Sequence, residues 1–242
     1  MTACPTLPAL PSRAAAAIAL LGAALACAAA PPARVFASYD LIRNGQQIGV
    51  VEETFEQTGE RYSIVSEARA TGLAALFVRG TQRVASRGTV TATGLRPEHF
   101  EGSRGDDPSR RVSALFDWDA RQLALAHDGK TETLPLAAGT QDRLSVMYQF
   151  MYLPVARLGS IEFEMTNGSK VEHYLYQVEG KETADTPLAR FATIKFSKRR
   201  SGDENSAEVW LAEERNYFPV RLVIAELNGD RLEQVLTRLD FD

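Results

Sequence analysis

Apolar and polar residues alternate along most of this chain in short runs. In the clearest run, Ile161, Phe163 and Met165 are separated by Glu162 and Glu164. Because successive side chains of a β-strand point to opposite faces, this alternation predicts a strand with one buried and one hydrated face. Runs of this kind predict further strands over residues 39–42, 47–55, 61–69, 81–91, 95–102, 111–116, 122–127, 131–134, 171–178, 191–197, 207–211, 220–227 and 232–241.

Turn dipeptides separate several of these runs. A two-residue hairpin loop needs positive φ at both central residues, and Asn-Gly and Asp-Gly adopt this conformation at little cost. Four such dipeptides occur, at residues 44–45, 128–129, 167–168 and 228–229. They favour antiparallel strands that pair with their sequence neighbours. About a dozen strands are too many for one flat sheet, so the predicted fold is mainly β, a curled antiparallel sheet that forms a half-barrel or barrel-like roll.

One long helix is predicted over residues 141–152. Its residues at helical spacing form a single apolar stripe, as in a helix that packs on a sheet. Thr140 or Asp142 can cap its N-terminus, and Pro154 ends it. The apolar stripe consists of Leu144, Met147, Tyr148 and Met151.

A short apolar segment lies between two predicted strands, at residues 73–78. Leu73, Leu76 and Phe77 have the spacing of a short helical turn. Burying each large side chain contributes about 1.5–3 kcal/mol, so three exposed ones are unusual without a partner or ligand. Two interpretations stay open, a plug of the core and a lid over a cavity. In the second, these residues line a ligand site together with Met147 and Met151.

The first 37 residues have the features of a secretory leader. Arg13 precedes an apolar run over residues 14–30, and Pro31 and Pro32 follow it. This run is short and rich in alanine, whereas a membrane-spanning helix needs about 20 strongly apolar residues. Residues 38–242 are therefore expected to form one periplasmic domain without a transmembrane segment. Lipidation of Cys27 is an alternative to simple cleavage.

Composition narrows the classes of function. Both cysteines, Cys4 and Cys27, fall in the expected leader, so the domain has no disulfide and no thiol nucleophile. The chain has 27 Lys and Arg against 31 Asp and Glu, a net charge of −4. This mildly acidic balance lacks the basic footprint of a nucleic-acid-binding protein.

No catalytic or metal-binding motif stands out. His99, His127 and His173 have none of the spacings typical of metal ligands, so we expect structural or surface histidines and no cofactor. A serine nucleophile motif of the form GxSxG does not occur. Asp117 and Asp119 flank a tryptophan and are the alternative acidic site, on the hypothesis of a carboxylate-dependent hydrolase or lyase that acts on cell-envelope polysaccharide. A surface turn is the competing interpretation of these two aspartates.

Four short motifs stand out along the chain, at residues 39–49, 72–77, 141–145 and 209–222. Together they resemble an exported bacterial family, the domain of unknown function 3108. The resemblance covers residues 36–242, and that family has no assigned activity, so it implies no catalytic residues. The strand, turn and strand of the last motif is also similar to the unclosed barrels of periplasmic lipoprotein carriers, which hold acyl chains.

The function expected from these features is non-enzymatic binding of an apolar or amphipathic ligand, or of an envelope partner, on the concave face of the sheet. A lipid or another envelope protein is the expected partner. The hydrolase or lyase is one alternative. The other is a structural adaptor without a pocket that docks through a sheet edge.

Overall fold

The computed structural model describes residues 30–76, 80–105, 107, 110–199 and 205–242. Within them lie one α-helix, four short 3₁₀ helices and fifteen strands. The helices are η1 (Gly72–Leu76), α1 (Ser145–Gln149), η3 (Phe150–Tyr152), η4 (Val155–Arg157) and η5 (Glu213–Arg215). The strands are β1 (Arg34–Arg43), β2 (Gln46–Thr58), β3 (Arg61–Ala70), β4 (Gln82–Thr91), β5 (Gly94–Arg104), β6 (Val112–Asp117), β7 (Gln122–His127), β8 (Lys130–Pro135), β9 (Gln141–Asp142), β10 (Ser160–Thr166), β11 (Val171–Asp185), β12 (Arg190–Lys198), β13 (Ser206–Ala212), β14 (Phe218–Ala225) and β15 (Arg231–Phe241).

All these strands form a single sheet, in the order β8-β7-β6-β5-β4-β3-β2-β1-β15-β14-β13-β12-β11-β10-β9. Every pairing is antiparallel except that of β9 with β10. Nearly every strand therefore pairs with its neighbour in sequence, as the hairpin signals predict. The exception is the pairing of β1 with β15, which joins the first and last strands in the middle of the sheet.

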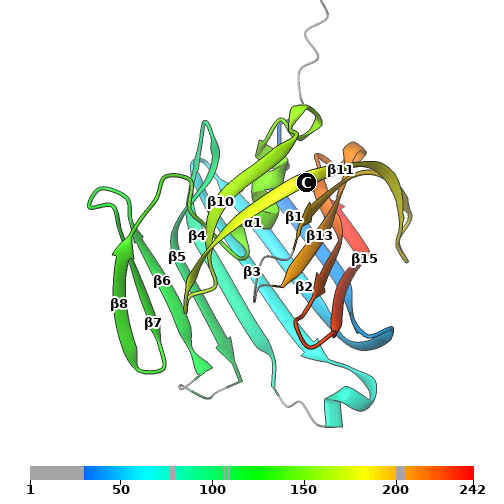
Figure 1. The fold of residues 1–242 in the computed structure, drawn as a ribbon, viewed down its shortest axis with the longest axis horizontal. Coiled ribbons are helices and arrows are strands. Elements are labelled where there is room, and N and C mark those ends of the chain that lie inside the picture. The colour runs from blue at the N-terminus through cyan, green and yellow to red at the C-terminus, as the bar shows by residue number, and fades with distance from the viewer. Residues whose placement is uncertain (1–29, 77–79, 106, 108–109, 200–204) are drawn as a thin grey trace, which may run out of the picture.

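The sheet curls strongly but its two edge strands, β8 and β9, do not pair, so the roll is unclosed in the part of the chain that the structure describes (Figure 1). Bulges help to bend it, because an extra residue on one strand kinks the pair. At the bulge after Arg87, a Cβ on Gly88 would lie 2.1 Å from the carbonyl oxygen of Arg96, so only glycine fits there. The curl brings the β10–β11 hairpin onto the opposite half of the sheet, where a Cβ on Gly168 would lie 3.1 Å from Phe100 of β5.

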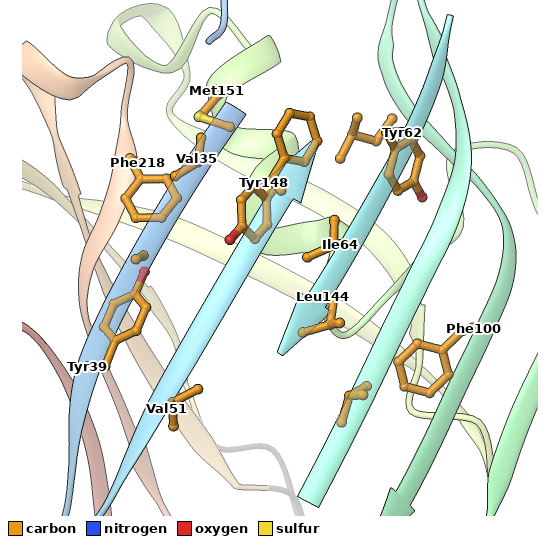
Figure 2. Packing of buried hydrophobic residues seen from close by; sticks show 14 of the residues in the cluster. Val35, Tyr39, Val51, Tyr62, Ile64, Phe100, Leu144, Tyr148, Met151 and Phe218 are labelled. Carbon is orange, nitrogen blue, oxygen red and sulfur yellow. The ribbon is translucent and has the colours of Figure 1, made fainter. Parts of the chain in front are cut away.

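Helix α1 lies inside the roll and fills its core (Figures 1 and 2). Tyr148 is fully buried, stacks on Phe55 at 5.2 Å between ring centroids and meets Phe218 edge-on at 5.6 Å. Leu144 and Met151 pack in the same cluster, as the predicted stripe implies. Phe150 points to a second cluster and lies 6.1 Å from the ring of Phe196 on β12. The segment thus buries more than one face, because the sheet surrounds it.

The long helix predicted over residues 141–152 is wrong in length. Gln141 and Asp142 pair with β10 as a short strand, and the α-helix begins only at Ser145. The last turn is the 3₁₀ helix η3, which ends before Pro154 as predicted. The N-cap position of α1 is Leu144 and not Asp142, but the Oδ1 atom of Asp142 still holds the start of the helix by accepting the backbone N–H groups of Leu144 and Ser145 at 2.9 and 2.8 Å. The short helical turn predicted near Leu73 is present as η1.

The fold begins earlier than the expected boundary at residue 38. Strand β1 starts at Arg34, and Val35 and Ala37 are buried in the core. These two side chains continue the alternation of β1 and pair with both β2 and β15. Most of the expected leader, residues 1–29, lies outside the described residues. Cys4 and Cys27 belong to this part.

Candidate functional site

A cavity of about 470 Å³ lies on the concave face of the sheet. Strands β2–β4 form one side, β10–β15 the other, and the start of α1 lies between them. Its lining is part apolar and part charged. The apolar and aromatic residues are Leu144, Met147, Met165, Tyr174, Tyr176, Ala207, Leu222, Ile224 and Leu232. The ionisable residues are Glu53, Arg143, Lys170, Glu172 and Lys198.

Glu53 is a buried carboxylate in the cavity wall, with only 9% of its surface exposed. Its two oxygens accept hydrogen bonds from the hydroxyls of Ser66 at 3.0 Å and Tyr148 at 3.2 Å. Burial raises the pKa of Glu53, and these two hydrogen bonds oppose the rise. Since both donors are neutral, Glu53 ties α1 to the sheet without an ion pair.

Asp142 is the second buried carboxylate, next to the cavity. Besides holding the start of α1, it accepts a 2.5 Å hydrogen bond from the hydroxyl of Ser86 on β4. Burial raises the pKa of Asp142 to about 6, although its hydrogen bonds with Ser145, Ser86 and Leu144 act in the opposite direction. Asp142 therefore fixes the start of α1 against β4.

Arg143 follows Asp142 and projects into the cavity. Its backbone N–H donates to the carbonyl oxygen of Thr166 at 3.0 Å, which fixes its position beside β10. Its side chain is exposed to the space of the cavity yet surrounded by protein, so that burial lowers the pKa of the guanidinium, whereas Glu53 and Asp142 raise it. An arginine under these influences stays charged at neutral pH.

Strands β10 and β11 form an aromatic wall. Phe163 stacks on Tyr174 and Tyr176, each at 5.8 Å between ring centroids. The ammonium group of Lys198 lies 4.0 Å from the centroid of the Tyr174 ring, a cation–π contact. Lys170 forms a 2.7 Å ion pair with Glu172 at this side of the cavity. This side of the cavity thus combines flat aromatic faces with the ammonium group of Lys198 and one ion pair.

The structure does not bring the predicted ligand-site residues together. Met147 lines the cavity, whereas Met151 is buried in the core cluster. Leu73 and Leu76 are 80% and 69% exposed on η1 and are absent from the cavity lining, so they do not plug the core. Phe77 lies outside the described residues.

The alternative acidic site lies on a surface turn. Both residues are exposed, Asp117 as the last residue of β6 and Asp119 in the turn that leads to β7. Asp117 accepts a 2.8 Å hydrogen bond from the backbone N–H of Ala120, which is the role of an aspartate that stabilises a turn. Neither residue lines the cavity.

The histidines lie apart from the cavity lining. His127 is 3.2 Å from Asp128 at a hairpin turn, and His173 lies between Glu162 and Glu164 at 3.1 and 3.2 Å. Across the described ranges, no three His, Cys, Asp or Glu side chains gather closely enough to hold a metal ion.

Sequence reasoning missed the charged residues of the cavity, although one signal was available. Glu53 alternates with Val51 and Phe55, both buried, so period-two reasoning places its side chain on the inward face of β2. Arg143 gave no such signal, because it belongs to the segment predicted as a long helix.

The fold and the cavity define an unclosed antiparallel β-roll around a short internal helix. The chain belongs to the family described as protein of unknown function DUF3108, which matches residues 38–237. No curated protein matches the chain in sequence. Where the structure is described, its helices are too short or too polar to cross a membrane.

Three solved structures are similar to the chain. A beta-barrel-like protein of the domain of unknown function DUF1849 from Brucella abortus has a TM-score of 0.55 at 13% identity, over 88% of this chain and 100% of that one. A Bacteroides fragilis protein described as exported, with a YmcC-like fold, has a TM-score of 0.41 at 15% identity, over 88% and 100%. A Parabacteroides distasonis protein described as a lipoprotein has a TM-score of 0.34 at 12% identity, over 87% and 96%. Only the Brucella abortus structure has a TM-score above 0.5. At 13% identity it supports a similar fold and nothing further.

Proposed function

We propose that this protein is a non-enzymatic binding protein of the bacterial periplasm that holds an apolar or amphipathic ligand in the cavity of its β-roll. The observation that carries the proposal is the cavity itself, about 470 Å³ between the two halves of the sheet. This volume falls within the range of about 300–1,000 Å³ typical of small-molecule sites. Its wall of methionine, leucine and aromatic side chains, interrupted by a few charges, suits a ligand with one apolar and one polar part.

Two further features support this function over the alternatives. The two aspartates of the hydrolase hypothesis, Asp117 and Asp119, lie on a surface turn and do not line the cavity, so they give that reaction no support. An adaptor without a pocket would not need a hollow interior. The leader pattern predicted for residues 1–37 supports the periplasmic location.

The proposal is tested by ligand extraction and by uptake of a neutral apolar probe. Protein purified from a bacterial periplasm is extracted with organic solvent, the extract is analysed by mass spectrometry, and the delipidated protein is titrated with N-phenyl-1-naphthylamine. We expect a recovered lipid and saturable fluorescence enhancement. Protein that carries no extractable lipid and excludes the probe would contradict the proposal.

Cavity variants locate the binding. Met147→Asp places a charge on the apolar wall and Met165→Trp fills the same space without burying a charge, so both should weaken uptake. Leu76→Asp is the matched surface control, because Leu76 is 69% exposed. Loss of uptake in Leu76→Asp as well would support the lid interpretation of η1. Thermal melting of each variant separates loss of binding from loss of fold.

A further inference from the structure

The Arg143 guanidinium has no direct counterion in the described part of the chain. Glu53 and Asp142 influence it electrostatically, but the oxygens of both carboxylates are occupied by neutral donors. Glu53 accepts from Ser66 and Tyr148, and Asp142 accepts from Ser86 and from the start of α1. Among the described residues no hydrogen bond or ion pair is found for the side chain of Arg143, so its five N–H donors face the cavity that Arg143 lines and favour an anionic partner there.

Arg143 also stands where two hollows meet. A second hollow of about 460 Å³ lies next to the cavity, and both are lined by Gln82, Arg143 and Asn167. The second hollow is largely polar and includes Arg104, whereas the cavity has the apolar wall. The three shared residues form a neck between the two hollows. A molecule that spans this neck meets an apolar surface on one side of Arg143 and a polar, positively charged surface on the other.

We propose that Arg143 binds the anionic group, carboxylate or phosphate, of a single-chain amphiphile whose apolar part lies in the cavity against α1 and β10–β15. This inference rests on the proposed function and names the class of ligand. The amide side chains of Gln82 and Asn167 flank the anion at the neck. A planar guanidinium can hold a carboxylate or phosphate through two parallel hydrogen bonds, which a lysine ammonium cannot do.

The test compares three ligands that share one apolar chain. Hexadecanoate, hexadecyl phosphate and hexadecanol each displace N-phenyl-1-naphthylamine from the full mature chain, and their dissociation constants follow from competition. Arg143→Gln should weaken the two anions by about 10- to 100-fold, the loss expected for a charge-assisted hydrogen bond, and leave hexadecanol unchanged. Arg143→Lys keeps the charge and should retain part of the anion affinity.

Arg190→Gln is the matched control, since it removes the same charge from an exposed arginine that pairs with Asp185 on the β11–β12 hairpin. It should leave all three affinities unchanged. A preference of the unaltered protein for hexadecanoate or for hexadecyl phosphate supports the inference and identifies the anion. If hexadecanol binds as tightly as both anions, or if Arg143→Gln changes all three alike, the role of Arg143 is refuted while the cavity function stands. If the probe binds but none of the three displaces it, this inference is refuted while the cavity function stands. If the probe itself does not bind, the proposed function fails and this inference with it.

Discussion

The buried carboxyl group of Asp142 makes the stability of this protein depend on pH. Its pKa rises from an ordinary value of 3.8 to about 6 because burial disfavours the charged form. Between these two values the folded protein binds more protons at Asp142 than the unfolded chain does. The contribution of Asp142 to the free energy of unfolding is therefore largest below pH 4 and declines as the pH rises through 6.

The size of this effect follows from the two pKa values. Each pKa unit corresponds to about 1.4 kcal/mol, so the separation between 3.8 and about 6 corresponds to about 3 kcal/mol. Asp142→Asn removes the titration and keeps the hydrogen bonds, because the amide oxygen still accepts from Leu144 and Ser145 while its NH₂ group donates to Ser86. Relative to the variant, the unaltered protein should lose about 2 kcal/mol of this stability between pH 4 and pH 7, because the rest is lost below pH 4.

The assay is urea unfolding followed by circular dichroism at several pH values from 4 to 7, with the difference between the two proteins plotted against pH. Asp230→Asn is a control of opposite sign. Hydrogen bonds from Asn44 and Arg43 lower the pKa of Asp230, so the unaltered protein should lose stability relative to that variant as the pH falls. A difference curve for Asp142→Asn that is flat, or that rises with pH, would refute the reasoning.

Further predictions concern packing and the start of the fold. Phe55→Ala should lower the free energy of unfolding in urea by about 3–5 kcal/mol, because Phe55 is fully buried and stacks on Tyr148. Gly88→Ala should lower the free energy of unfolding by about 1–3 kcal/mol, because the added Cβ meets the backbone of β5. Gly159 has open space around it, so the Gly159→Ala variant should melt within a few degrees of the unaltered protein. A chain that begins at residue 38 should lose its cooperative thermal transition, because the first strand loses buried side chains, and a chain that begins at residue 31 should keep it. Equal melting of the two truncated chains would contradict that boundary.

Local turn chemistry was the most predictable part of the fold. Asn44-Gly45 and Asp128-Gly129 have positive φ at both residues and join neighbouring strands directly, because the conformation depends on those two residues alone. Asn167 departs from the pattern. Its side-chain oxygen accepts the backbone N–H groups of Ser169 and Lys170, which makes a longer loop in which only Gly168 has positive φ.

Features that depend on distant contacts were less predictable. Gln141 and Asp142 carry a helical pattern but pair with Met165 and Thr166 of β10, which lie 24 residues further along the chain. The location of Arg143 in the cavity follows from that pairing, so it could not be inferred from spacing. The apolar spacing at Leu73 correctly predicted a helical turn, but periodicity gave no information on what covers it, and the structure leaves Leu73 exposed.

The pairing of β1 with β15 has a consequence for chain connectivity. It places the ends of the fold side by side, with the N–H of Ala33 donating to the carbonyl oxygen of Asp242 at 3.2 Å. Meanwhile β8 and β9, consecutive in sequence, lie at opposite edges of the sheet and are joined by residues 136–140, of which 137–139 are exposed. A circular permutant that links Asp242 to Ala33 and opens within 137–139 would run β9 to β15 and then β1 to β8. Every strand would then pair with the one before it, and the lower contact order should make this permutant fold faster than the natural chain.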